Sequence, residues 1–243
     1  MHQCNRERTY TAIAALFCVC LILTNTIGMK LFILPGIQAP LPAGLLIYPL
    51  TFVLNDVVNE IYGSQRASFM VWLSFTLNLL VMCIIRLVLV LPAHPYWFVP
   101  NNPWGFATLQ EYQNAFNSVF QINTTIVFAS MAAYLTGQLL DIFLYQKIKK
   151  LSNNRFLWLR SNVSTILSQL MDTIIVFSII LFYGLKVDFL KGVEIMIVSY
   201  SFKVIATLLT TPLFYGSIWF LRRGSSSDLR KTTEATKSLM RGR

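Results

Sequence analysis

Amide and carboxylate side chains occur close together at three places in otherwise apolar stretches of this sequence. Asn55 precedes Asp56, Gln138 comes three residues before Asp141, and Gln169 comes three residues before Asp172. With Glu60, these three aspartates are the four acids of the apolar stretches. A carboxylate accepts two parallel hydrogen bonds from a planar N–H/NH₂ edge, and an amide supplies both a donor and an acceptor. The pairs therefore suit a planar heterocycle such as a guanine-like base, or a small cation.

Other side chains of the same stretches fit a flat, uncharged ligand. Aromatic rings near the pairs are available to stack on a planar ring, namely Tyr48, Phe52, Tyr134, Tyr200 and Phe202. Only two basic residues, Arg86 and Lys203, lie in these stretches against the four acids. A permanent anion is therefore a poor candidate ligand.

Enzyme and metal signatures are missing from the sequence. It contains no HExxH, GxSxG or P-loop motif, and these are the patterns expected of zinc proteases, hydrolases and nucleotide-binding enzymes. Two aspartates could form a protease pair, but the residues around them resemble no such motif. The four cysteines form no CxxC pair, and His2 and His94 lie outside the apolar stretches. We expect no enzyme activity, no cofactor and no metal site.

The apolar stretches predict membrane-spanning helices. The chain has 243 residues, of which 55% are hydrophobic and only 12% charged, so a soluble enzyme, a disordered chain and a disulfide scaffold are excluded. A bilayer core needs about 20 apolar residues in a helix. Alternating strand patterns are absent. The sequence predicts an all-α integral membrane protein with six spans, at about 11–28, 44–62, 67–91, 119–140, 162–183 and 193–220.

The basic residues predict which side of the membrane each loop faces. With both termini in the cytoplasm, fifteen of the twenty Lys and Arg residues lie on the cytoplasmic side and three lie outside. This bias follows the positive-inside rule, so the net charge of +10 reports topology and indicates no nucleic-acid partner. The basic segments are expected to contact anionic lipid headgroups. Residues 1–222 form the transmembrane domain, and 223–243 are expected to be a basic, disordered tail.

The predicted spans place three charged residues near the middle of the membrane. Counting about 1.5 Å per residue from the span ends, Asp56, Asp172 and Lys203 lie about 15–18 Å deep. Transporters commonly bind substrate at this depth. Structural roles stay open: Asp172 and Lys203 can neutralise each other, and Asp141 can be an interfacial anchor near Lys147. Glu60 can extend to the interface or pair with Arg66.

Four segments together resemble a known family. They are YPLTFVLNDVVNEIYGSQRA (48–67), ASMAAYLTGQLLDIFLYQKIKK (129–150), LRSNVSTILSQLMDTIIVF (159–177) and YSFKVIATLLTTPLFYG (200–216). In this order they resemble the YhhQ, or VUT, family of queuosine-precursor transporters. The resemblance implies a six-span protein of the bacterial inner membrane. It would import 7-deazaguanine bases, in some members queuine, for tRNA modification and queuosine salvage, without an ATPase.

The resemblance places the family's polar motif positions on residues nearly all of which are already selected by their place in apolar stretches, Arg160 being the exception: Asn55, Asp56, Glu60, Gln138, Asp141, Arg160, Ser168, Gln169, Asp172 and Lys203. A deazaguanine offers a carboxylate its N1–H and exocyclic NH₂. The resemblance therefore gives a hypothesis in which Asp56 or Asp172 accepts from that edge and an adjacent amide binds the carbonyl. An aromatic side chain, from Tyr48, Phe52 or Tyr200, stacks on the ring.

Several alternatives stay open at this point. The chain can carry another vitamin or nucleobase, or be a membrane subunit that binds substrate and needs an energising complex. An intramembrane enzyme is a further class. The sequence also leaves open the precursor, the driving ion and whether two chains form a homodimer.

Overall fold

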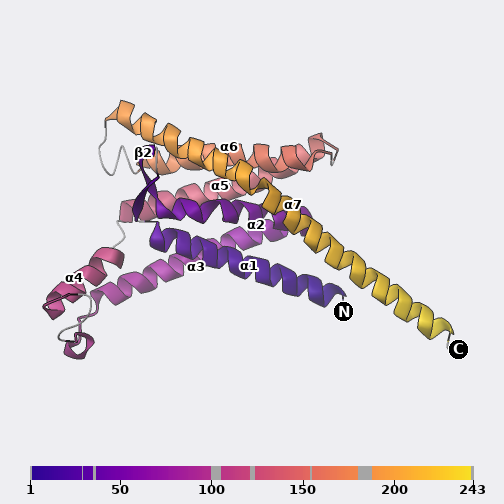
Figure 1. Ribbon diagram of the computed structural model, residues 1–243, viewed down its shortest axis with the longest axis horizontal. Coiled ribbons are helices and arrows are strands. Elements are labelled where there is room, and N and C mark those ends of the chain that lie inside the picture. Colours follow the sequence, from indigo (N-terminus) through magenta and orange to yellow (C-terminus); the bar gives the residue numbers. More distant parts are fainter. Residues whose placement is uncertain are drawn as a thin grey trace.

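The computed structural model describes residues 2–28, 30–34, 37–99, 105–120, 124–153, 155–179 and 188–241. It is a helical bundle with one small hairpin (Figure 1). The α-helices are α1 (His2–Ile27), α2 (Tyr48–Ile61), α3 (Ser64–Val90), α4 (Leu109–Phe120), α5 (Thr124–Leu151), α6 (Leu157–Phe177) and α7 (Phe189–Arg241). Shorter elements are the strands β1 (Leu31–Leu34) and β2 (Ile37–Pro42) and the 3₁₀ helices η1 (Ala43–Leu46) and η2 (Pro95–Trp97).

Three helices of the described chain are long and apolar enough to cross a bilayer. These segments are Arg6–Ile27 in α1, Ser64–Val90 in α3 and Phe189–Leu221 in α7. Most of their residues are not buried within the protein, and large apolar side chains such as Leu16, Leu80 and Leu209 point outward. An exposed apolar surface of this length is stable in lipid and not in water. The chain is therefore a membrane protein.

Helix α2 lies inside the bundle and is buried along most of its length. It has 14 residues, ten of which are buried. One apolar cluster packs it against α1, α3 and α5 through Phe17, Val58, Met70 and Tyr134. A second packs it against α5 and α7, through Val57, Tyr145 and Phe214 among others. Leu157 of α6 also packs against the second cluster, and α6 further meets α2 through polar contacts such as that of Ser161 with Asp56.

The second predicted span, 44–62, starts later as an α-helix than the sequence indicates. Residues Ala43–Leu46 form the 3₁₀ helix η1, and α2 begins at Tyr48 with Pro49 in its first turn. Proline favours this position because its fixed φ suits a helix start and its missing N–H is not needed there. Helix α2 is therefore about 21 Å long, shorter than the ~30 Å bilayer core.

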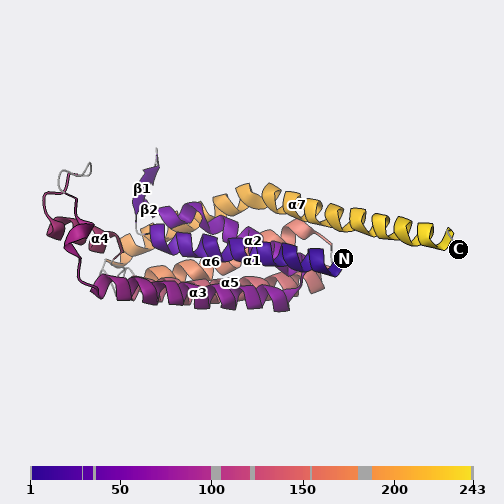
Figure 2. The same ribbon diagram turned by 90° about the horizontal axis from the view of Figure 1, so that it is seen from below.

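A hairpin precedes η1 and departs from the all-helical expectation. Strands β1 and β2 pair antiparallel, with Leu31 opposite Pro42 and Leu34 opposite Ile37. The hairpin and α4 lie at one end of the bundle and both termini at the other (Figures 1 and 2). Residues 121–123 of the predicted fourth span and residues 180–183 of the predicted fifth span lie outside the described part of the chain.

Helix α7 is the longest element and contains Pro212. It changes direction part-way along its length, as Figure 2 shows; a proline inside a helix removes one backbone hydrogen bond and causes such a bend. The helix continues to Arg241, in the segment 223–243 that the sequence suggests is disordered. No proline follows Pro212. Apart from its serines and threonines, the segment consists mostly of Lys, Arg, Glu, Leu and Met, which are residues that favour helices.

Candidate functional site

The buried polar side chains form three groups along α2. The Lys203 cluster (Tyr48, Asp172, Thr173 and Lys203) lies at the end of α2 near the hairpin. The aspartate layer (Asn55, Asp56, Asp141, Ser161, Ser164, Thr165 and Ser168) is in the middle. The Glu60 cluster (Glu60, Tyr145, Lys149 and Arg160) lies at the end near the N-terminus, where Arg6 donates to the carbonyl of Ile61.

In the Lys203 cluster, both oxygens of Asp172 have partners. Lys203 Nζ donates to Oδ2 at 2.5 Å, and the Tyr48 hydroxyl donates to Oδ1 at 2.8 Å. The same ammonium donates to Thr173 Oγ1 at 3.1 Å and lies 5.2 Å from the centre of the Tyr48 ring. The neutralising pair of Asp172 and Lys203, one of the two roles left open by the sequence, is present.

Gly137 allows α5 to pack closely against this cluster. A Cβ atom at Gly137 would lie 3.2 Å from Cβ of Asp172 and 3.7 Å from the carbonyl oxygen of Ser168. The first distance is shorter than ordinary van der Waals contact. Glycine at this position therefore determines how near Gln138 and Asp141 come to α6.

Asp141 in the aspartate layer is fully buried and accepts four hydrogen bonds. Its Oδ1 accepts from the hydroxyls of Ser164 at 2.8 Å, Thr165 at 3.2 Å and Ser168 at 3.5 Å. Its Oδ2 accepts from Asn55 Nδ2 at 3.2 Å. Asp141 is therefore not an interfacial anchor near Lys147, because α5 turns it toward α6 and α2.

Asp56 lies in the same layer and is only partly satisfied. It is 2% exposed, and the Ser161 hydroxyl donates to its Oδ2. Its Oδ1 is buried without a hydrogen-bond partner among the described residues. A buried polar atom without a partner is costly, so a ligand that donates to this oxygen would gain from doing so.

The three amides predicted to accompany the acids are also half-satisfied. Gln138 Nε2 donates to Thr51 Oγ1 at 3.4 Å, and Gln169 Oε1 accepts from Thr207 at 3.2 Å. In the described chain, Gln138 Oε1, Gln169 Nε2 and Asn55 Oδ1 have no partner. The amides and Asp56 together leave three acceptors and one donor unused.

The Glu60 cluster joins α2 to α5 and α6. Arg160 donates to Glu60 at 2.7 Å, Lys149 at 2.9 Å and the Tyr145 hydroxyl at 3.1 Å. Pairing with Arg66, one of the roles that the sequence leaves open for Glu60, is not among the described ion pairs. Gly63, at φ +87°, reverses the chain after α2, so Arg66 on α3 meets Glu7 of α1 instead, at 2.7 and 2.9 Å.

The aromatic residues proposed to stack on a ligand lie in two places. Tyr48 and Phe52 are buried, and their rings meet edge to face with centres 5.2 Å apart. Tyr200 is separate from them: its hydroxyl donates to the carbonyl of Ile166 at 3.2 Å. Only Phe52 of the three lines the pocket described next.

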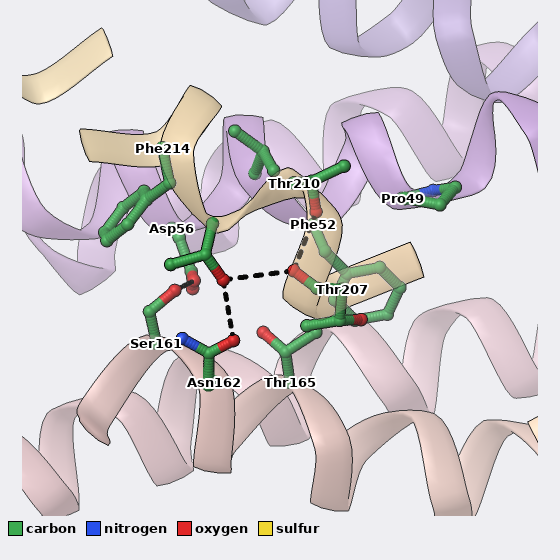
Figure 3. Close-up of a pocket in the computed structure, with 11 residues that line it drawn as sticks. Pro49, Phe52, Asp56, Ser161, Asn162, Thr165, Thr207, Thr210 and Phe214 are labelled. Carbon is green, nitrogen blue, oxygen red and sulfur yellow. Dashed lines mark hydrogen bonds between the residues drawn. The ribbon is translucent and has the colours of Figure 1, made fainter. Parts of the chain in front are cut away.

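A small pocket lies beside Asp56 between α2, α6 and α7 (Figure 3). Its cavity is about 10 Å³, which is room for about one water molecule. Figure 3 shows Asp56 and Ser161 facing each other at one side and Thr207 and Thr210 of α7 at the other. Its polar lining is Asp56, Ser161, Asn162, Thr165, Thr207, Thr210 and Thr211.

Sequence reasoning missed six of these seven residues, which are Ser161, Asn162, Thr165, Thr207, Thr210 and Thr211. Thr211 donates to Asn162 Oδ1 at 2.9 Å, which joins α7 to α6. A signal was available, because Thr207, Thr210 and Thr211 recur at helical spacing on an otherwise apolar helix. Among the described residues, no three His, Cys, Asp or Glu side chains are grouped to hold a metal ion.

Comparison with known proteins identifies the family. A family model described as "Putative vitamin uptake transporter" matches residues 42–217. This range extends from the last residue of β2 into α7 and includes the three clusters and the pocket. The chain belongs to the vitamin uptake transporter family. It is therefore a membrane transport protein.

Curated relatives of this family member carry more specific names. A "Probable queuosine precursor transporter" of Bacillus subtilis is 31% identical over 184 residues, which are 75% of this chain and 72% of the relative. The "Queuosine precursor transporter" of Escherichia coli is 27% identical over 175 residues, 71% of this chain and 70% of the relative. A similarly named protein of Haemophilus influenzae is 26% identical over 177 residues, 72% and 67% of the two chains. No solved structure matches this chain.

Proposed function

We propose that this chain imports queuosine precursors, which are 7-deazaguanine bases, across the bacterial inner membrane for tRNA modification. The names of the relatives support the substrate class. The observation that carries the proposal is the set of unpartnered buried atoms in and beside the aspartate layer, three acceptors and one donor. A protein that leaves such atoms unsatisfied gains free energy when a ligand pairs with them.

The chemistry of the base matches these atoms. A 7-deazaguanine presents its N1–H and exocyclic NH₂ along one edge and a carbonyl oxygen next to them. In the proposed complex, Asp56 Oδ1 and Gln138 Oε1 accept from the N–H edge, and Gln169 Nε2 donates to the carbonyl. Phe52 stacks on the ring beside the pocket. A base placed this way satisfies groups that otherwise lack partners.

The roles of the two mid-membrane aspartates differ in this proposal. Both oxygens of Asp172 are held by Lys203 and Tyr48, so Asp172 positions α6 against α2 and α7. Asp56 keeps an unpartnered oxygen and faces the pocket. Of the two candidates from the sequence, we therefore assign contact with the N–H edge to Asp56.

Binding requires the helices around the pocket to move. A cavity of about 10 Å³ is far smaller than the 300 Å³ or more of typical small-molecule sites. Helix α7 forms one wall and bends near the middle of its length (Figure 2). We propose that α7 pivots at Pro212 to admit the base between itself and α6.

The proposed topology has six spans with both termini in the cytoplasm. Helices α1, α2, α3, α5, α6 and α7 each overlap one of the six stretches predicted as spans, which supports this topology. The termini lie at one end of the bundle (Figure 1), and fifteen of twenty basic residues fall on that side in this topology. Basic residues of the 147–160 segment then lie near anionic headgroups.

The proposal is tested in a bacterial strain that lacks its own precursor transporter and cannot synthesise the precursors. The wild-type chain should restore queuosine in tRNA when a 7-deazaguanine base is supplied. Asp56→Asn should abolish restoration while its membrane abundance stays normal. Asp188→Asn, an exposed acid at the start of α7, is the matched control and should behave as wild type.

Two results would contradict the proposal. Failure of the wild-type chain to restore queuosine with any precursor, although it is present in the membrane, would remove the substrate assignment. Guanine or adenine abolishing uptake at concentrations equal to the deazaguanine would point to another nucleobase as substrate. Normal uptake by Asp56→Asn would leave the function standing and remove Asp56 from the site.

A further inference from the structure

Asp56 and Asp141 are two buried acids that share one layer of the bundle without a basic partner. They are 2% and 0% exposed. The four ion pairs among the described residues involve Glu7, Glu60 twice, and Asp172, so neither acid of the layer takes part in one. A pair of buried carboxylates without a compensating charge is unfavourable in a membrane interior.

Helix α6 contacts both carboxyl groups within about one helical turn. Ser161 donates to Asp56, and one turn further along the same face Ser164 and Thr165 donate to Asp141. Thr165 also lines the pocket with Asp56. Asn55, which precedes Asp56 in the chain, also donates to Asp141. A hydrogen bond between two such carboxyl groups requires a proton on one of them.

The buried charged groups on either side of the layer are already paired. On the side of the layer toward the N-terminus, Glu60 of α2 accepts hydrogen bonds from Lys149 and Tyr145 of α5 and from Arg160 of α6. On the other side, Asp172 of α6 contacts Lys203 of α7 and Tyr48 of α2. Glu7 of α1 pairs with Arg66 of α3. None of these cations contacts Asp56 or Asp141.

We propose that Asp56 and Asp141 together bind one proton while the substrate is enclosed, which couples import of the base to proton entry. This inference rests on the proposed function. A proton from the outer solution forms an O–H bond with one carboxylate and is held by the other, so the charge of the pair falls from −2 to −1. The proton is released to the cytoplasmic solution when the site opens there.

The hydrogen bonds of the layer favour a proton over sodium. Hydroxyl groups of Ser161, Ser164, Thr165 and Ser168 donate toward the carboxylates. Asp141 lies within hydrogen-bond distance of four donors, and Ser164 and Ser168 can also donate to the carbonyls of Ser161 and Thr165. A sodium ion needs several oxygen lone pairs directed at one point, whereas a proton needs only the two carboxyl groups.

The test uses purified protein in liposomes with a labelled 7-deazaguanine base and the membrane potential clamped at zero. With an outside pH about one unit below the inside pH, one proton per neutral base sustains about tenfold accumulation. A pH-sensitive dye inside should report acidification when the base is added. A sodium gradient at equal pH should give no accumulation.

Asp141→Asn separates coupling from transport. Asparagine resembles the protonated acid but cannot release the proton, so exchange of labelled for unlabelled base should persist while the accumulation ratio falls to about one. Asp188→Asn, an exposed acid, should keep the tenfold ratio. If Asp141→Asn gives no exchange, the deciding measurement is the number of protons that enter the liposome with each base through the wild-type chain. The proposal requires one proton per base.

The outcomes distinguish the two proposals. Absence of exchange in wild-type liposomes overturns the proposed function. Suppose that the wild-type liposomes exchange the base, but the pH gradient gives no accumulation and the addition of base gives no internal acidification. This result overturns the proton site and leaves the proposed function standing. Accumulation driven by sodium, or a full pH-driven ratio in Asp141→Asn, also overturns the proton site.

Discussion

The Lys203 ammonium lies 2.5 Å from the carboxylate of Asp172, and the two side chains are each 6% exposed. The contact joins α6 to α7, and Tyr48 of α2 donates to the same carboxylate. Three helices thus converge on one acid. This arrangement explains why a lysine and an aspartate occur deep in apolar helices, and it leaves Asp56 as the acid with an unused oxygen beside the pocket.

Removing one partner of this pair should destabilise the protein more than removing both. Asp172→Asn or Lys203→Met leaves a buried charge without its counter-charge, which costs about 3 kcal/mol. The double variant removes both charges and should lose less than the sum of the two. Thermal unfolding of the four proteins in detergent checks this. Additive losses would show that the two charges do not interact.

The Glu60 cluster predicts a contrast between buried and exposed ion pairs. Glu60→Gln leaves Arg160 and Lys149 without their carboxylate in a site where Glu60 is 5% exposed, and it should lower stability by about 3 kcal/mol. Glu7→Gln removes the carboxylate of a pair whose side chains are 47% and 40% exposed. Exposed pairs contribute little, so no measurable change is expected. Equal unfolding midpoints for the two variants would contradict the prediction.

Gly137 should tolerate no side chain, because α5 and α6 meet there. Gly137→Val places its methyl groups against Asp172 and the Ser168 carbonyl, which forces the helices apart and separates Gln138 and Asp141 from α6. Uptake of the base should fall at least tenfold. Gly216→Val is the control, because a Cβ there has no atom within 4 Å. Similar uptake by the two variants would show that the close approach is not needed.

The proposed topology predicts where reporter proteins are active. A fluorescent protein fused after residue 243 should fluoresce, and alkaline phosphatase fused there should be inactive, because both report a cytoplasmic C-terminus. Alkaline phosphatase inserted after Gly105, before α4, should be active. An active phosphatase at the C-terminus would exclude an even number of spans with the N-terminus inside.

The sequence alone was sufficient for the class of protein and for its family. Long apolar stretches with few charges require a membrane, and the family match confirms the resemblance seen in the motifs around Asp56 and Gln169. Polar residues selected from the sequence, such as Asn55, Asp56 and Gln138, are buried, as expected because a polar group in an apolar helix must face the protein interior. Local properties of the chain determine each of these conclusions.

Only the tertiary structure decided which of these residues meet. Asn55 reaches Asp141 across 86 positions and Tyr48 reaches Asp172 across 124, and such contacts depend on how the helices pack. The pairing of Glu60 with Arg160 instead of Arg66 follows from the turn at Gly63 and the closeness of α6 to α2. Spacing along one helix shows which side chains share a face, whereas packing determines what that face contacts.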